Sequence, residues 1–245
     1  MTYVLIKEEE TMKIVKASYK IETPISNMPT IKELAKGVTY TEWNHPGINE
    51  LKTIEMAARN CYKSEARTTE DEESAKKMVK MLIDSGHEAM LEHSFLTIRF
   101  ICDRAISHEL VRHRMASFAQ ESQRYCNYSK GQFEGHVTFV QPFWMKDGTT
   151  EWGIWKKACL DAEKAYFDLL EFGLKPEQAR MVLPNCTKTE VVMSANYREW
   201  RHILKLRTAP AAHPDMQNMM IGLCHELQTR IPVVFDDIIG GDERT

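Results

Sequence analysis

The 245-residue sequence lacks the motifs that identify several common classes of protein. It has neither a Walker phosphate-binding loop nor a Gly-x-Gly-x-x-Gly fingerprint, and its 11 glycines do not cluster. A nucleotide ligand would therefore have to be held by side chains rather than by a glycine-rich loop. No apolar run approaches the ~20 residues that are needed to cross a bilayer, so we expect no membrane contact.

Disulfide and zinc signatures are also missing. The six cysteines are dispersed along the chain without a Cys-x-x-Cys pair, at positions 61, 102, 126, 159, 186 and 224. This spacing favours reduced thiols in a cytosol over a disulfide framework or a zinc site. The apolar start at residues 1–6 is too short for a signal-peptide core, and glutamates follow it at residues 8–10. We therefore expect a cytoplasmic protein.

An excess of basic charge is missing as well. The formal net charge is -3, which argues against a general nucleic-acid-binding protein. The remaining composition, 43% hydrophobic and 27% charged, is that of a soluble globular protein. The hydrophobic pattern becomes regular at Met12, and no repeat or linker follows. We predict an N-terminal extension over residues 1–11 and a single domain over residues 12–245.

Periodicity predicts helices interspersed with a few strands. Helical spacing, caps and terminal glycines or prolines indicate helices at 51–61, 74–85, 103–114, 152–172, 176–184, 196–207 and, after a break at Pro214, 216–231. Short apolar or alternating runs indicate strands at 14–15, 19–21, 95–102 and 190–194. Loops are expected at 24–29, 37–50 and 63–73, and in the small residues that follow Arg114. The predicted fold class is α/β (α+β), with helices packed on a small central sheet.

Residues 112–124, with the sequence RHRMASFAQESQR, place three arginines close together. Guanidinium groups are permanently charged and bind phosphate through paired hydrogen bonds, so a cluster of them favours a ligand with several negative charges. The small residues between the arginines allow such a ligand to approach backbone amides. For the basic triplet by itself, a helix face in contact with solvent is the alternative explanation.

The whole spacing, Arg-His-Arg-x7-Ser-x-Arg, resembles the signature of the flavin-dependent thymidylate synthases. Four further segments occur in the order that this family shows: HEAMLEH at 87–93, ARMVLP at 179–184, Asn196-x-Arg198 and Leu206-Arg207. The resemblance implies an enzyme that methylates dUMP to dTMP. It implies 5,10-methylenetetrahydrofolate as carbon donor, FAD as hydride donor and NADPH as the reductant of FAD. It also implies a homotetramer with active sites shared between subunits, and no nucleic-acid partner.

The resemblance assigns roles to individual residues. The residues implied for dUMP binding are Glu109, Arg112, Gln120, Glu121, Ser122, Gln123, Arg124, Arg180 and Arg207. Those implied for FAD binding are His87, Ala89, Arg112, His113, Arg114, Gln120, Asn196, Arg198 and His202. Arg207 is also the implied catalytic residue, because a fixed cation stabilises negative charge that develops on the uracil ring.

Several of these residues have simpler explanations. Arg180 suits a surface charge at a helix end, and Asn196 suits a helix cap. His87 and His93 do not have His-Glu-x-x-His spacing and lack a third ligand, so no metal is predicted. Cys126 has no neighbour that would lower its pKa, and we interpret it as structural. A non-catalytic nucleotide or nucleic-acid phosphate-binding protein and a metal-dependent hydrolase are the alternative functions.

Five positions depart from the family pattern. Glu109 occupies a position where glutamine is common, and Gln120 one where glutamate is common, which suggests a compensating exchange. His202 replaces a common asparagine, Ala211 a common histidine, and Ala89 a small polar residue near the flavin. These departures concern individual contacts and leave the predicted activity in place.

Overall fold

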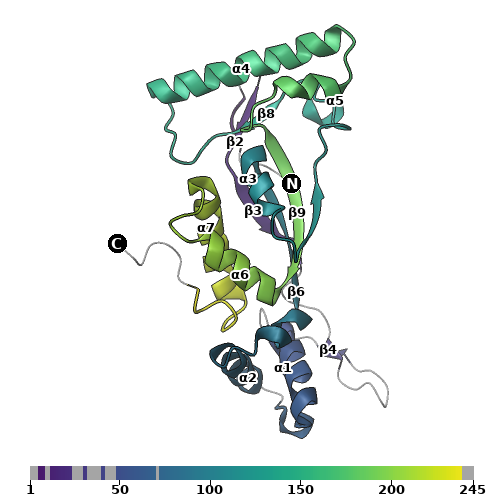
Figure 1. Cartoon of the computed structure of the whole chain (residues 1–245), viewed down its shortest axis with the longest axis vertical. Helices are drawn as coiled ribbons and strands as arrows, with labels where there is room; N and C mark the ends of the chain where they lie inside the picture. The colour runs from purple at the N-terminus through teal and green to yellow at the C-terminus, as the bar shows by residue number, and fades with distance from the viewer. Residues whose placement is uncertain are drawn as a thin grey trace. The chain divides into compact units, whose positions relative to one another are not determined.

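The computed structural model describes residues 5–8, 12–23, 30–31, 40–41, 48–69 and 72–238. The predicted loop at 24–29 lies outside the described residues. The chain divides into two compact units, and Figure 1 labels their elements. Unit 1 contains residues 1–20, 99–114 and 118–193, and unit 2 contains residues 21–98, 115–117 and 194–245.

A three-stranded sheet lies in unit 1. Its central strand β2 (Lys13–Val15) pairs antiparallel with β1 (Leu5–Glu8) and parallel with β8 (Thr138–Val140). Ile14 pairs with Phe139 across β2 and β8, and both side chains are buried. The strand predicted at 14–15 is confirmed, and part of the predicted extension forms β1.

Helix α4 (Thr150–Glu171) packs against this sheet (Figure 1). The Thr149 hydroxyl accepts a hydrogen bond from the Trp152 amide at 3.3 Å and so caps the first turn. Gly173 ends the helix at a φ of 87°, a conformation that favours glycine. The core between sheet and helix consists of Met12, Ile14, Tyr128, Val137, Phe139, Cys159, Tyr166 and Ala179. The helix predicted at 152–172 is confirmed.

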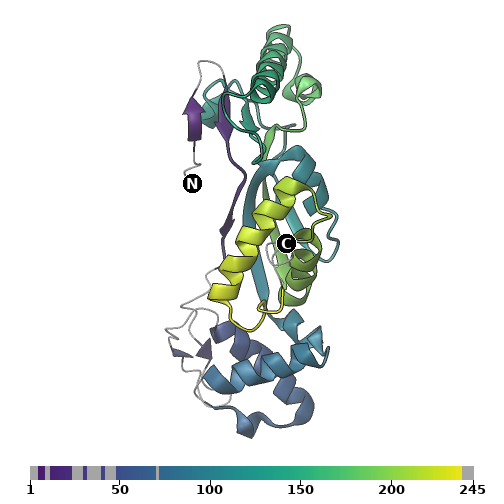
Figure 2. The same ribbon diagram turned by 90° about the vertical axis from the view of Figure 1, so that its left-hand side faces the viewer.

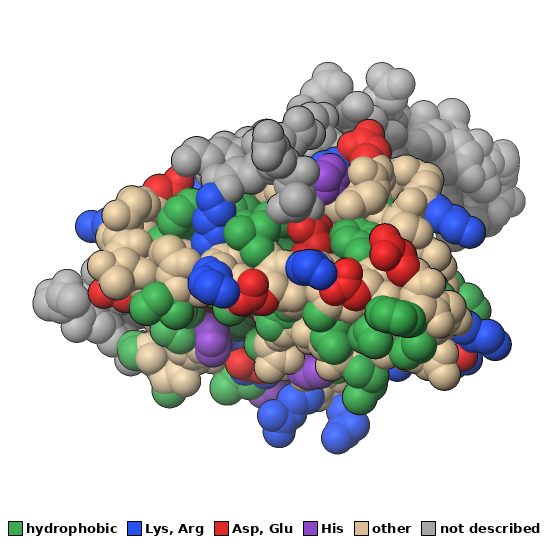
Figure 3. Space-filling view, turned by 90° about the horizontal axis from the view of Figure 1, so that it is seen from above, with side chains coloured by type: hydrophobic (Ala, Val, Ile, Leu, Met, Phe, Trp, Pro, Cys, Tyr) green, Lys and Arg blue, Asp and Glu red, His purple; other side chains and the backbone are tan. Residues whose placement is uncertain are grey.

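The outer face of α4 carries charges of both signs. Lys157 lies 2.6 Å from Asp161, and Lys164 lies 2.5 Å from Asp168, each pair one helical turn apart. Figure 3 looks onto this helix from above and shows acidic, basic and hydrophobic side chains interspersed. In the described part of the chain, no helix combines the length and apolar character that crossing a membrane requires.

A four-stranded sheet has the strand order β3-β6-β9-β7. Its strands are β3 (Ser18–Ile21), β6 (Phe95–Asp103), β9 (Lys188–Asn196) and β7 (Ser117–Gln120). The long strands β6 and β9 contribute residues to both units. Buried and half-buried side chains alternate along β9, which confirms this strand and extends it beyond the predicted 190–194.

Strand β7 (Ser117–Gln120) shows that the loop predicted after the basic triplet is only partly right: Met115 and Ala116 form a turn and a bend, but residues 117–120 form a strand. Exposed and half-buried side chains alternate along it, as expected of a strand with one covered face. Ser117 and Ala119 occupy the exposed positions. Their small size indicates a loop in the sequence, but pairing with β9 decides the conformation. Only the residues after Gln120 turn away from the strand.

Helix α3 (Arg104–Leu110) begins as predicted and ends earlier. The Asp103 carboxylate accepts a hydrogen bond from the Ile106 amide at 2.7 Å, which is the cap expected from the sequence. Because the helix ends at Leu110, the basic triplet lies in the turn that follows. The predicted short helix is present as α5 (Pro176–Ala179) and the 3₁₀ turn η4 (Arg180–Val182).

In unit 2, helices α1 (Ile48–Tyr62) and α2 (Glu72–Asp84) pack side by side (Figure 2). Glu55 of α1 is fully buried and accepts a hydrogen bond from Arg59 Nε at 2.9 Å. Arg59 also donates to the Ser74 hydroxyl of α2 at 2.9 Å. The buried carboxylate is stable because a cation and a hydroxyl compensate it. Both predicted helices are confirmed.

The prediction of an irregular stretch at 37–50 is wrong at two places. Strand β5 (Tyr40–Thr41) pairs with β4 (Thr30–Ile31), and α1 already begins at Ile48. A two-residue strand is too short to show alternation in the sequence. The predicted loop at 63–73 contains the 3₁₀ turn η1 (Glu65–Arg67) and stops where α2 begins.

Helices α6 (Tyr197–Arg207) and α7 (Pro214–Arg230) lie side by side and confirm the predicted C-terminal helices (Figures 1 and 2). Trp200 is fully buried, and its Nε1 donates to the Leu96 carbonyl at 3.0 Å. The 3₁₀ segment η2 (Glu88–His93) lies against α6. The methionines buried in α7, which fill the core as predicted, are Met216, Met219 and Met220.

Candidate functional site

In unit 1, the basic triplet forms the turn after α3. The amides of Arg112 and His113 donate to the carbonyls of Glu109 and Leu110, at 3.3 and 3.2 Å. His113 is buried, whereas Arg112 and Arg114 are exposed. Among the described residues, neither arginine side chain has a hydrogen-bond or ion-pair partner. Two permanent cations are therefore available to an external anion.

The end of β7 is held by β9. The Gln120 side-chain amide donates to Ser107 Oγ at 2.9 Å and to Thr189 Oγ1 at 3.3 Å. The next residue, Glu121, donates its backbone N–H to the Glu190 carbonyl at 2.8 Å. A glutamate at position 120 could only accept from these hydroxyls, and the Ser107 hydroxyl already donates to the Arg104 carbonyl at 2.9 Å, so glutamine suits this position better. The departure at Gln120 therefore has a local structural role.

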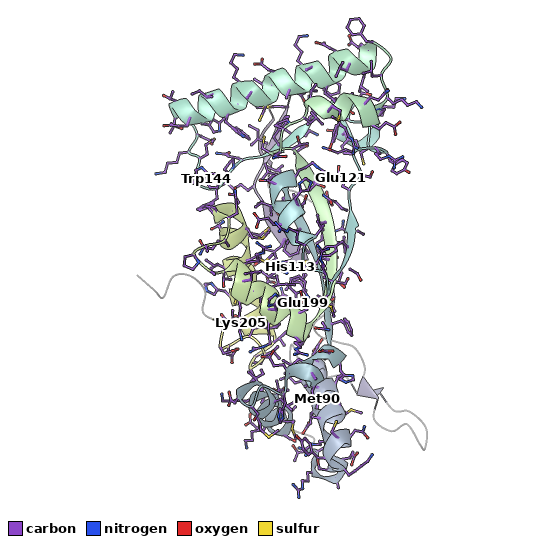
Figure 4. The ribbon with its side chains drawn as sticks, in the orientation of Figure 1. Met90, His113, Glu121, Trp144, Glu199 and Lys205 are labelled. Atoms are coloured by element: carbon purple, nitrogen blue, oxygen red, sulfur yellow. The ribbon has the colours of Figure 1, made fainter. Side chains whose placement is uncertain are left out.

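The Glu121 carboxylate, labelled in Figure 4, has a partner within the protein. Its Oε2 atom lies 3.0 Å from Lys188 Nζ, which also lies 2.9 Å from Glu190 Oε1. Burial alone would lower the pKa of Lys188, but the two carboxylates outweigh it and raise that pKa above its ordinary value. Lys188 is therefore a permanent buried cation.

A turn follows β7 and carries the Ser-x-Arg part of the motif. The Cys126 amide donates to the Ser122 carbonyl at 2.9 Å, and the Arg124 amide donates to Ser122 Oγ at 3.3 Å. The Arg124 side chain is exposed and lies 3.7 Å from Glu177, in a surface ion pair of little energetic worth. The turn thus offers a hydroxyl and a guanidinium two residues apart.

Three other residues near the motif differ in what they offer a ligand. Arg180, the first residue of η4, is half-buried and has no ion pair with a described residue. Gln123 is buried, so its side chain lies in the protein interior. Burial and the Glu121 carboxylate raise the pKa of the Cys126 thiol, which suppresses the reactive thiolate. This agrees with a structural role for Cys126.

Unit 2 contains a hollow of about 440 Å³ beside α6. Its lining residues are Glu88, Glu92, Met115, Asn196, Arg198, Glu199, Arg201, His202 and Lys205. Glu199 and Lys205 both belong to α6 (Figure 4). The structure therefore brings together three members of the implied FAD set, Asn196, Arg198 and His202.

Arg201 fixes the wall of this hollow. The side chain is almost fully buried, and its Nε donates to Glu88 Oε1 at 3.2 Å. Its two Nη atoms donate to the Asp237 carboxylate at 2.5 and 2.8 Å, and one also donates to the Val234 carbonyl. Burial raises the pKa of Asp237, but Arg201 and Lys205 outweigh it and hold that pKa below its usual value. Arg201 thus ties η2 and the segment after α7 to α6.

Asn196 and Arg198 occupy the start of α6. Asn196 Oδ1 accepts a hydrogen bond from the Glu199 amide at 2.8 Å, which confirms the helix cap. Arg198 lies 2.6 Å from Glu92, and the two side chains are 51% and 45% exposed. Since an exposed ion pair contributes at most ~1 kcal/mol, an incoming anion can replace Glu92. Arg198 is therefore a cation of the hollow whose protein partner a ligand can replace.

Three residues implied by the resemblance do not line the hollow. His87 precedes η2 and Ala89 lies within it, and both are exposed. Arg207 ends α6 and is half-buried. His213, near the position of the missing histidine, accepts a hydrogen bond from the Asp215 amide at 3.3 Å and caps α7. The described residues contain no group of three or more His, Cys, Asp or Glu side chains arranged to hold a metal ion.

Sequence reasoning missed most of the lining of the hollow. The missed residues are Glu88, Glu92, Met115, Glu199, Arg201 and Lys205. A usable signal was present, because Arg198, Arg201, His202 and Lys205 recur at the spacing that places residues on one face of a helix. Met115 carries no comparable signal.

Comparisons with known proteins agree with this arrangement. The family model described as thymidylate synthase complementing protein matches residues 47–233. The flavin-dependent thymidylate synthase of Pyrococcus abyssi is 33% identical over 185 residues, which cover 74% of this chain and 75% of that protein. The protein of the same name from Thermococcus onnurineus is 34% identical over 174 residues, covering 69% and 70% of the two chains. That from Corynebacterium aurimucosum is 31% identical over 200 residues, covering 75% and 78%.

Proposed function

The chain belongs to the thymidylate synthase complementing protein family (Thy1), and we therefore propose that it is a flavin-dependent thymidylate synthase. The proposed reaction is the reductive methylation of dUMP to dTMP. 5,10-Methylenetetrahydrofolate is the proposed carbon donor, and NADPH is the proposed reductant of FAD. One catalytic domain over residues 12–245 after an extension at 1–11 remains part of the proposal; the family match covers residues 47–233, which belong to both units.

The observation that carries the proposal is the set of arginines in unit 1 without a protein anion. Arg112 and Arg180 have no ion pair among the described residues, and Arg124 has only a weak surface pair. Like charges gathered in one segment are stabilised when an anion binds between them. The phosphate of a nucleoside monophosphate meets this need, with Ser122 and Arg124 as its proposed ligands.

The hollow in unit 2 suits part of a flavin nucleotide. Arg198 can exchange Glu92 for a diphosphate, and His202 and Asn196 offer further polar contacts. In unit 1, His113 and Arg114 stay proposed FAD contacts. When bound, reduced FAD supplies the hydride of the reaction. The residues of this chain contribute binding, orientation and positive charge.

Other parts of the proposal rest on the family resemblance. Arg207 is the proposed catalytic residue, which stabilises the uracil ring as an anion. His87, Ala89 and Gln120 are proposed to lie close to the flavin, and Glu109 close to dUMP. A homotetramer with active sites shared between subunits, in the cytoplasm, completes the proposal.

Two measurements on the purified protein test this function. The protein is expected to be yellow, with the absorption spectrum of an oxidised flavin, and to oxidise NADPH when dUMP and methylenetetrahydrofolate are present. Formation of dTMP identifies the product. A colourless protein that binds polymeric nucleic acid with a steep salt dependence would instead support a phosphate-binding protein. Hydrolysis abolished by a chelator would support a metal-dependent hydrolase.

A further inference from the structure

Lys188 is a buried cation in the middle of unit 1. Its side chain is 7% exposed and lies between two carboxylates, those of Glu121 and Glu190. Glu190 also accepts a hydrogen bond from Arg99 at 3.2 Å. Burying an ammonium group is unfavourable unless anions and hydrogen bonds compensate it, and the two carboxylates supply that compensation.

Lys188 and its neighbours on β9 bond to the end of β7, directly before the proposed phosphate-binding turn. Consecutive residues of β9, Lys188, Thr189 and Glu190, hold consecutive residues at the end of β7, Gln120 and Glu121. The bonds include a side-chain ion pair, a side-chain hydrogen bond and a backbone hydrogen bond. The segment that begins at the next residue carries the proposed phosphate ligands. Its starting point is therefore set by Lys188 and its neighbours.

Direct substrate contact by Glu121 fits this geometry poorly. Its carboxylate is only 13% exposed, one oxygen faces Lys188, and the other is buried. An ionised carboxylate beside a phosphate would also repel it, unless a cation neutralises the carboxylate. Lys188 provides that neutralisation at 3.0 Å.

We infer that Lys188 is a positioning residue for the phosphate-binding turn. Its pairing with Glu121 cancels a negative charge beside the site and fixes the turn at residues 122–126, and Glu121 itself does not contact the substrate. The inference deepens the proposed function and rests on it for the identity of the ligand, a pyrimidine nucleoside monophosphate.

A double-mutant cycle on the flavin-loaded enzyme tests the inference. The variants are Glu121→Gln, Lys188→Met and the double variant, with the dissociation constant of dUMP measured by calorimetry. We expect Lys188→Met to weaken dUMP binding by about tenfold and Glu121→Gln by about threefold, with the double variant no weaker than Lys188→Met. Effects that multiply would show that Glu121 contacts dUMP independently and would overturn the inference.

Matched variants separate positioning from general loss of structure. Lys157→Met removes a lysine from an exposed ion pair on α4 and is expected to leave dUMP binding unchanged. Lys188→Arg keeps the charge and is expected to restore most of the affinity that Lys188→Met loses. The flavin spectrum is expected to stay the same in the Glu121→Gln variant, in which Lys188 keeps Glu190 as its partner. Unchanged dUMP affinity in Glu121→Gln would also overturn the inference.

A ligand-free measurement distinguishes failure of the inference from failure of the proposed function. Amide hydrogen exchange at Arg124 and Cys126, whose amides are bonded to Ser122, is expected to become faster in Lys188→Met or in the double variant. Exchange in α4 is expected to stay unchanged. If exchange at the turn is also unchanged, the positioning role is wrong. If wild-type protein neither binds dUMP nor forms dTMP, the proposed function is wrong whatever the exchange shows.

Discussion

The arginines of unit 1 and those of unit 2 are compensated in opposite ways. In unit 1, Arg112, Arg114 and Arg180 have no ion pair with a described residue. In unit 2, Arg201 is buried between Glu88 and Asp237, and Arg198 pairs with Glu92. Cations without a protein partner are available to a ligand, whereas buried paired cations hold elements together. Arg112, Arg114 and Arg180 are thus available to a ligand, Arg201 holds elements together, and Arg198 has an exposed pair that a ligand can replace.

One acid in each unit has a shifted pKa, and the two shifts have opposite directions. Burial raises the pKa of Glu163, on α4, to about 7, although the Val137 amide, which donates to it at 2.7 Å, and His136 both lower it. The pKa of Asp237 in unit 2 is below its usual value, because Arg201 and Lys205 outweigh the effect of burial. The buried Glu163, which has no ion pair with a described lysine or arginine, favours its neutral form, whereas Asp237, which is 44% exposed and lies beside Arg201 and Lys205, favours its charged form.

Among the arginines, the largest effect on stability is expected from Arg201→Met. Removing the guanidinium leaves the Val234 carbonyl without its donor and the partly exposed Glu88 and Asp237 carboxylates without their shared cation, so we expect the free energy of unfolding to fall by about 1–3 kcal/mol. Denaturant unfolding followed by circular dichroism measures this change. Arg198→Met, which removes only an exposed pair, is the matched control and should cost less than about 1 kcal/mol. Equal effects in the two variants would break the distinction between architectural and exchangeable arginines.

Arg207→Ala is expected to lose turnover while it retains flavin. Removing one fixed donor beside developing negative charge typically lowers kcat by about 10²–10³-fold. The side chain is half-buried at the end of α6 and lies outside the lining of the hollow, so flavin content is expected to be unchanged. Steady-state kinetics and the flavin spectrum give the two readouts. Full activity in the variant would remove the role assigned to Arg207.

Glu163 gives unit 1 a characteristic pH dependence. Its folded-state pKa of about 7 lies above the ordinary value of 4.5, so its contribution to stability is present below pH 4.5 and is lost as the pH rises to about 7. This loss amounts to about 3 kcal/mol if the whole shift is expressed. The difference in unfolding free energy between wild type and Glu163→Gln, measured from pH 4.5 to 8, is expected to show it.

Asp237→Asn is the counterpart for Glu163→Gln. The pKa of Asp237 is lowered in the folded state, so the stability it contributes is present above its ordinary value of 3.8 and is lost as the pH falls below it. The difference in unfolding free energy between wild type and each variant should therefore change with pH over a separate range for each variant, and the two slopes against pH should have opposite signs. Slopes of the same sign would contradict the contrast between Glu163 and Asp237.

Local features were predictable from the sequence because their causes are local. Asp103 and Asn196 each cap a helix through an amide three residues further along, and both caps were expected. Contacts between distant segments were not predictable. Lys188 and Glu121 are 67 residues apart, and nothing in either segment indicates the other. Likewise, Cys159 and Cys186 are dispersed in the sequence, yet their sulfur atoms lie 3.6 Å apart.

Burial of charge was the other feature that the sequence concealed. Arg201 has the composition of a surface residue, and only the tertiary fold supplies the acids that allow it to be buried. The helical stripe that contains it was visible, but the stripe by itself fits a solvent-exposed face equally well. In β7, small residues indicated a loop, and the partner strand decided otherwise.

Arg124→Ala tests whether an exposed arginine of unit 1 contributes to ligand binding rather than to stability. Its side chain is 58% exposed, and it has a 3.7 Å ion pair with Glu177 and lies 5.5 Å from the centroid of the exposed Tyr125 ring, so its removal is expected to leave the free energy of unfolding nearly unchanged. If it binds the phosphate of dUMP, its loss should weaken binding by about 1.5–3 kcal/mol, the typical worth of a charge-assisted hydrogen bond. Calorimetry with dUMP and with deoxyuridine measures this, because the nucleoside lacks the phosphate and should bind both proteins equally. Arg67→Ala, which removes an exposed arginine of η1, controls for the change in net charge. An equal loss of affinity for dUMP and for deoxyuridine would place Arg124 away from the phosphate.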